Sequence, residues 1–117
     1  MPRMYLQVTE NVPEITHAWE HLRTLVHELS MHESIEPEKV KAFFYEHRSW
    51  AMGEGAPKGF VNLKVAMLPR PPEVKREIAD LLHAKLCELY KESLATKKAA
   101  VSVELRDMDP DTYRLSQ

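Results

Sequence analysis

The chain has 117 residues, which is the size of a single domain. Hydrophobic residues make up 44% of it, charged residues 29%, and the formal net charge is -2, a soluble globular composition with no general basic field for nucleic acid. Because no apolar run approaches the roughly 18 residues of a membrane span and the N-terminus lacks a signal-peptide core, we expect a cytoplasmic protein with no membrane or nucleic-acid partner.

The first informative residue is Pro2, which precedes an alternating segment, residues 3–9, that predicts a β-strand. If Met1 is removed, Pro2 carries a free secondary amine and becomes a candidate general base. An α-amino group has a pKa of roughly 7.7 to 8.0, and burial or a nearby cation such as Arg3 or Lys41 would lower it. The alternative is that a small residue at position 2 serves only methionine removal.

Residues 14 to 31 predict an amphipathic helix, with Asn11 as its cap and Pro13 in its first turn. His17 and His21 lie roughly opposite the apolar face and have no evident third ligand, so we expect both to be solvated and to bind no metal. The apolar face, assigned from a rotation of about 100° per residue, consists of Ile15, Ala18, Trp19, Leu22, Leu25, Val26 and Leu29.

Residues 41 to 50 predict a second strand, because they are rich in aromatic side chains and lie between Pro37 and Gly53. Residues 53 to 57 form a turn, and residues 59 to 68 alternate as a third strand with one buried face. In the second strand the alternation gives one shared face to Lys41, Phe43, Tyr45 and His47.

A proline-rich segment, residues 69 to 72, begins a second helix that we expect to end near Thr96. Cys87 is the one cysteine, so the chain cannot form an internal disulfide, and no motif indicates a nucleophile. Residues 99 to 106 alternate as a fourth strand and precede a polar tail. The apolar stripe of the helix consists of Val74, Ile78, Leu81, Leu82 and Leu89.

The predicted order is β-α-β-β-α-β, an α+β fold in which a four-stranded sheet carries two helices on one face. The proline-led helices and the second strands of the two halves are both offset by about 59 residues. We therefore expect one domain, 1–117, built from two β-α-β units, about 2–50 and 59–107, each pairing its strands in parallel through a right-handed crossover. The ferredoxin-like sandwich has the same element order and stays an alternative.

The chain resembles the tautomerase superfamily, and within it the 5-carboxymethyl-2-hydroxymuconate delta-isomerase group. The resemblance covers nearly the whole length and rests on the order and spacing of several segments rather than on any single one. They are Met1-Pro2 with its strand, Glu10-Asn11-Val12, residues 49–55 (SWAMGEG), Phe60-Val61-Asn62-Leu63, residues 101–105 (VSVEL) and Asp109-Pro110.

The resemblance implies a homotrimer with active sites near the subunit boundaries and a small carboxylate as substrate. It also implies catalysis without a cofactor, with Pro2 as the base, in the catabolism of aromatic compounds. Lys41 stands where the isomerase group usually carries an arginine, and lysine keeps the charge but loses the planar fork that binds a carboxylate through two hydrogen bonds. Arg70 lies within a residue of another family arginine, just before the second helix.

We therefore expect Pro2, Lys41 and Arg70 to be catalytic, and Tyr45 and Trp50 to be candidate substrate-binding residues. The expected activity is tautomerisation or isomerisation of small 2-hydroxy-dienoate or 2-keto acids. Two alternatives stay open. One is a hydratase or dehalogenase-type enzyme in which a cationic Pro2 is an acid, and the other is a non-catalytic ligand-binding or assembly module.

Overall fold

The structure is a computed structural model that describes residues 2–117, so the predicted removal of Met1 lies outside the described residues. Its elements confirm the order β-α-β-β-α-β, with short 3₁₀ turns (η1, η2) added. They are β1 (Arg3–Thr9), η1 (Pro13–His17), α1 (Ala18–Ser30), η2 (Pro37–Lys39), β2 (Lys41–His47), β3 (Gly59–Met67), α2 (Pro72–Leu89), α3 (Lys91–Ala95) and β4 (Ala99–Asp107).

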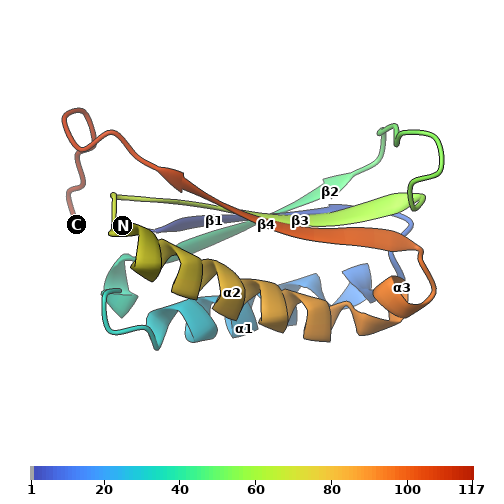
Figure 1. The fold of residues 1–117 in the computed structure, drawn as a ribbon, viewed down its shortest axis with the longest axis horizontal. Coiled ribbons are helices and arrows are strands. Elements are labelled where there is room, and N and C mark those ends of the chain that lie inside the picture. Colours follow the sequence, from blue (N-terminus) through green and yellow to red (C-terminus); the bar gives the residue numbers. More distant parts are fainter. Residues whose placement is uncertain (1) are drawn as a thin grey trace.

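The four strands form one sheet in the order β2-β1-β3-β4. β1 pairs with β2 in parallel and β3 pairs with β4 in parallel, as expected, while β1 and β3 run antiparallel at the centre. Because each β-α-β unit keeps its two strands adjacent rather than split by a third strand, this topology excludes the ferredoxin-like alternative. Figure 1 shows α1 and α2 side by side on one face of the sheet.

The core lies between the sheet and these helices. Alternate residues of β1 and β3 point inward and are almost completely buried, as the period of two predicts. Full burial of one such side chain contributes about 1.5–3 kcal/mol. The inward residues are Met4, Leu6 and Val8 of β1 and Val61, Leu63, Val65 and Met67 of β3, packed in one cluster with Leu25, Leu29, Ile78, Leu82 and Leu86 of the helices.

None of the helices within residues 2–117 lies over the opposite face of the sheet (Figure 1). The register confirms that Lys41, Phe43, Tyr45 and His47 share this open face with Arg3, Tyr5 and Gln7. The aromatic rings stack on it, with 5.5 Å between the ring centroids of Tyr5 and Phe43 and 6.3 Å between those of Tyr5 and Tyr45. Phe43 and Tyr45 are nonetheless 40% and 47% exposed in the single chain.

The first helix departs from the prediction at its start. The chain makes a 3₁₀ turn from Pro13, the α-helix begins only at Ala18, and neither start has a side-chain cap. The prediction that Asn11 is the cap was wrong, because its side chain is used elsewhere. Its Oδ1 accepts a hydrogen bond from Thr9 Oγ1 at 2.6 Å, and its Nδ2 donates to the Lys58 carbonyl at 3.4 Å.

Two residues of α1 lie on the opposite side from the one predicted. Trp19 was assigned to the apolar face but is 70% exposed, and His21 was assigned to solvent but is only 7% exposed. His21 is buried because its ring packs edge-on against the Tyr90 ring, with 4.7 Å between ring centroids. His17 is exposed, as predicted.

Two further boundaries differ from the prediction. β2 ends at His47, so Trp50 lies beyond the strand. The second helix does not continue to Thr96 but is interrupted at the buried Tyr90 and resumes as α3. Among residues 2–117, none of the helices has the combination of length and hydropathy that crossing a membrane requires.

Candidate active site

Pro2 directly precedes β1, one of the two central strands, and it is buried. Its carbonyl accepts a hydrogen bond from the Lys41 N–H at 3.1 Å, which extends the β1–β2 ladder by one residue. On the other side, β1 begins opposite the end of β3, with Arg3 paired to Ala66. The backbone at Pro2 is therefore fixed by neighbouring strands, as the positioning of a catalytic group requires.

Lys41 lies directly beside the start of β1, because the parallel register pairs it with Arg3. Both side chains point to the open face of the sheet. None of the carboxylates in residues 2–117 forms an ion pair with either of them. Two cations without an ion-pair partner among residues 2–117 therefore lie near Pro2. Arg3 is on the strand that Pro2 precedes, and Lys41 is on the adjacent strand.

Arg70 lies at the same end of the sheet, in the loop between β3 and α2. Its guanidinium donates to the Leu68 carbonyl at 2.6 Å and to the Ser34 carbonyl at 3.1 Å. These bonds tie the loop before α2 to the loop after α1. Because a guanidinium has five N–H donors, the two bonds leave further donors for a ligand. The structure thus brings Pro2, Lys41 and Arg70 to one end of the sheet.

The two predicted substrate-binding residues lie farther away within one chain. Tyr45 is four residues along β2 from Lys41, which at about 3.3 Å per residue places it about 13 Å away. Trp50 lies at the opposite end of the sheet, where its indole Nε1 donates to the Lys58 carbonyl at 2.8 Å. Neither meets Pro2 in the single chain, so their role stays a prediction for a site completed by another copy.

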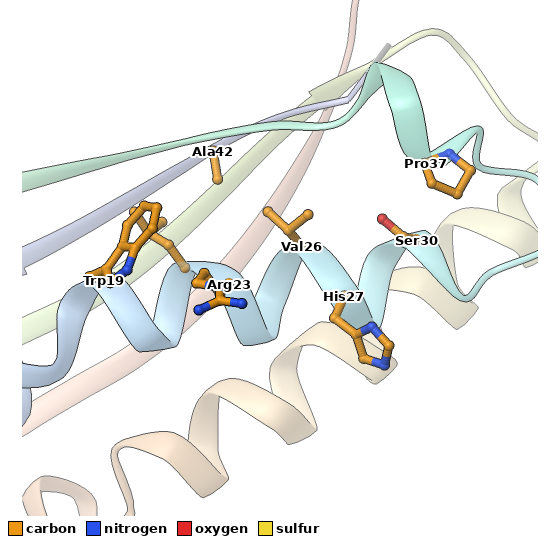
Figure 2. Close-up of a pocket in the computed structure, with 8 residues that line it drawn as sticks. Trp19, Arg23, Val26, His27, Ser30, Pro37 and Ala42 are labelled. Carbon is orange, nitrogen blue, oxygen red and sulfur yellow. The ribbon is translucent and has the colours of Figure 1, made fainter.

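A cavity of about 430 Å³ lies between α1 and β2 but contains none of the predicted site residues. Figure 2 shows Val26 of α1 pointing toward Ala42 of β2, with Trp19 at one end and Pro37 at the other. Ala42 lies on the opposite face of β2 from Lys41. The remaining residues that line this cavity are Leu22, Arg23, His27 and Ser30.

A second cavity, of about 340 Å³, lies where β1 and β2 begin. Arg3 and Lys41 contribute to it from the sheet, and the C-terminal tail supplies Thr112, Tyr113, Arg114 and Leu115. The Arg3 guanidinium carbon lies 5.7 Å from the centre of the Tyr113 ring. Our sequence reasoning missed the tail residues. The one available signal was an aromatic residue followed by a cation in the polar tail.

One cluster of groups with clearly shifted pKa values lies elsewhere, near the N-terminus of α1. Burial lowers the pKa of His21, and the neighbouring His17 adds to the effect. Burial alone would raise the pKa of Glu14, but hydrogen bonds from the Ser93 hydroxyl and N–H outweigh it and lower this pKa. Glu14 therefore anchors α3, a structural role that accounts for the cluster.

No protein-family model matches the chain, and no curated protein matches its sequence. Solved structures do match. A 5-carboxymethyl-2-hydroxymuconate isomerase from Deinococcus radiodurans R1 is 24% identical with a TM-score of 0.87, over 98% of this chain and 88% of the other. Pt0534, in a form inactivated by 2-oxo-3-pentynoate, is 13% identical with a TM-score of 0.77, over 97% and 91%.

A fused 4-OT that forms a symmetric trimer is 18% identical with a TM-score of 0.68, and the match covers 97% of this chain and 91% of the other. The likeness in each case extends over nearly the whole chain. It confirms the predicted tautomerase-like fold, with its four-stranded sheet and its helices on one face.

Proposed function

We propose that this chain is a tautomerase-superfamily isomerase, which acts without a cofactor on small 2-hydroxy-dienoate or 2-keto acids and uses Pro2 as its general base. The observation that carries the proposal is the position of Pro2, which directly precedes a central strand and has Arg3 and Lys41 beside it. The fold is shared with a 5-carboxymethyl-2-hydroxymuconate isomerase, which supports an isomerase activity for this chain.

The proposed chemistry moves one proton. With Met1 removed, the neutral amine of Pro2 takes a proton from the enol hydroxyl, or from a carbon next to the carbonyl, and becomes a cation. The substrate becomes an enolate whose charge is shared between oxygen and carbon. Pro2 then returns the proton to a conjugated carbon, so the product is an isomer and the amine is neutral again.

The cations supply the electrostatic part of the mechanism. Lys41 and Arg70 are proposed to hold the substrate carboxylate and the oxygen on which enolate charge develops, since stabilisation aimed at developing charge is often the largest contribution to catalysis. The same positive charges disfavour a protonated amine, so the pKa of Pro2 should lie below that of an ordinary α-amino group. The base would then be neutral at working pH.

We also propose that the active form is a homotrimer. The open sheet face presents Phe43 and Tyr45, 40% and 47% exposed, which a single chain leaves in water. A fused 4-OT of the same fold is a symmetric trimer, which supports this assembly. Tyr45 and Trp50 would then serve at a site near the boundary between copies.

The test is the keto-enol tautomerisation of phenylenolpyruvate by wild type, Pro2→Ala and a control, Arg76→Gln, which removes an exposed charge from α2. Loss of the proline amine as base should lower kcat/KM by about 10²-fold or more, while the control retains wild-type activity. Turnover that survives Pro2→Ala unchanged would contradict the proposal. Activity that falls instead of rising as the pH passes upward through the pKa of Pro2 would favour the hydratase-type alternative.

A further inference from the structure

The turn that follows α1, residues 31–35, is organised around His32. The side chain of His32 is only 9% exposed. Its ring Nδ1 accepts a hydrogen bond from the Ser34 N–H at 3.1 Å and lies 2.9 Å from Ser34 Oγ. Because a backbone N–H can only donate, Nδ1 is the unprotonated nitrogen of the ring, and the Ser34 hydroxyl donates to it as well. One ring nitrogen therefore holds two donors of Ser34.

The backbone of His32 holds the next peptide group of the same turn. The peptide between Ser34 and Ile35 directs its N–H to the His32 carbonyl at 3.0 Å. The Ile35 side chain is 5% exposed and packs in the core. Because a peptide group is planar, holding its N–H also sets the direction of its carbonyl. The direction of the Ser34 carbonyl is therefore set by contacts that His32 makes on both sides.

This Ser34 carbonyl is an acceptor for Arg70. The Arg70 Nη2 donates to it at 3.1 Å, while Nη1 donates to the Leu68 carbonyl, two residues back along the same loop, at 2.6 Å. Only the bond to Ser34 joins Arg70 to a distant part of the sequence. A free arginine side chain carries about 2 kcal/mol of rotamer entropy, so an acceptor that is itself fixed is needed to hold the guanidinium in one place.

The other ring nitrogen of His32 faces α2. Its Nε2 lies 3.6 Å from Glu77 Oε2, which is longer than a hydrogen bond, and Glu77 is 69% exposed. The attraction across this distance is therefore weak. Figure 1 shows the end of α1 and the beginning of α2 at the same end of the molecule. His32 thus lies between the two helices, and its stronger contacts are those to Ser34.

We propose that His32 is a positioning residue for Arg70. Its Nδ1 fixes the turn after α1, and the Ser34 carbonyl then holds the Arg70 guanidinium in the orientation that binds an anionic oxygen of the substrate. This inference rests on the proposed function, in which Arg70 is one of the cations of the site. His32 acts through Arg70 rather than on the substrate, and the turn requires its acceptor nitrogen rather than a charge.

Two variants separate the acceptor from the rest of the side chain. His32→Leu removes the acceptor, so kcat/KM for phenylenolpyruvate should fall by about tenfold, because a displacement of about 1 Å in a site can cost this much or more. Asparagine accepts hydrogen bonds from the backbone two residues on, so His32→Asn should stay within about threefold of wild type. The matched control is His27→Leu, which removes an exposed histidine from α1 and should leave kcat/KM unchanged.

A double-mutant cycle determines whether His32 acts through Arg70. Arg70→Gln removes the guanidinium, so in that background His32→Leu should cost less than about twofold. A tenfold loss in both backgrounds would overturn the inference, because His32 would then support the fold in general. Equal losses in His32→Leu and His32→Asn, or no loss in either, would also overturn it. If His32→Leu does not fold, His32→Ala takes its place in the cycle.

Nuclear magnetic resonance of the Arg70 side chain separates this inference from the proposed function. The order parameter of the Arg70 Nε–H should fall in His32→Leu and be retained in His32→Asn, whatever reaction the protein catalyses. If Pro2→Ala retains full activity, the proline-base mechanism fails, and the order parameter alone decides the role of His32. If Pro2→Ala is inactive but His32→Leu leaves Arg70 equally ordered, only the positioning inference fails.

Discussion

Replacement of Tyr90 by phenylalanine should stabilise the protein. Tyr90 is completely buried at the junction of α2 and α3, and its hydroxyl has no hydrogen-bond partner among residues 2–117. The loss of water around this hydroxyl raises the pKa of Tyr90, and the negative charge of Glu14 adds to the effect. The ring itself packs against His21 and is retained in Tyr90→Phe.

The magnitude follows from the buried hydroxyl. An unpaired polar group in the interior costs about 1–3 kcal/mol, and removal of the oxygen recovers this penalty. The space left by one oxygen and the lost packing contacts offset a part of the gain. We therefore expect the free energy of unfolding to rise by about 1 kcal/mol.

The assay is equilibrium unfolding in urea at one fixed protein concentration, because the proposed assembly would make apparent stability depend on concentration. Tyr113→Phe is the matched control, since Tyr113 is only half-buried and its hydroxyl is not an unpaired buried group. A loss of about 1 kcal/mol or more in Tyr90→Phe would refute the reasoning, because it would mean that the hydroxyl has a partner in the folded protein.

Two further stability predictions follow from the same end of the molecule. Because burial lowers the pKa of His21 below its ordinary value of 6.5, the unfolded state takes up the proton first and stability should fall as the pH drops below about 6.5. His21→Phe should flatten this dependence between about pH 7 and 5, and an unchanged slope in urea midpoints would contradict it. A Cβ at Gly59 would lie 2.6 Å from both Thr9 Oγ1 and Asn11 Oδ1. Gly59→Ala should therefore cost about 1–3 kcal/mol, and a wild-type thermal midpoint would show that the contact relaxes freely.

The bounds of the first, third and fourth strands were the most predictable part of the fold, whereas the second strand ends at His47 instead of Trp50. Residues 3–9 were bounded correctly and the third and fourth strands to within a residue, because a buried face makes their alternation strict. The burial of His21 in α1 was missed for a tertiary reason. Whether His21 is buried depends on which side of the helix Tyr90 covers, and spacing along one helix does not contain that information.

The candidate site was predictable only in part. Pro2, Lys41 and Arg70 were predicted as site residues from residue type and resemblance, and they lie at one end of the sheet; their catalytic role stays a prediction. The position of Tyr113 and Arg114 beside Arg3 and Lys41 could not be predicted, because the tail has no periodicity. Their position depends on backbone hydrogen bonds between distant segments, such as that from Met108 to Met67.

The most direct test of the central claim is a labelling experiment with 2-oxo-3-pentynoate, the compound that inactivates Pt0534. Its alkyne is conjugated to a ketone and accepts addition of a neutral amine. Intact mass and peptide mapping should find one adduct per chain, on Pro2 of a chain that lacks Met1, with activity lost in proportion to labelling. A chain that retains Met1, or a label on another residue that accounts for the lost activity, would contradict the proline-base mechanism.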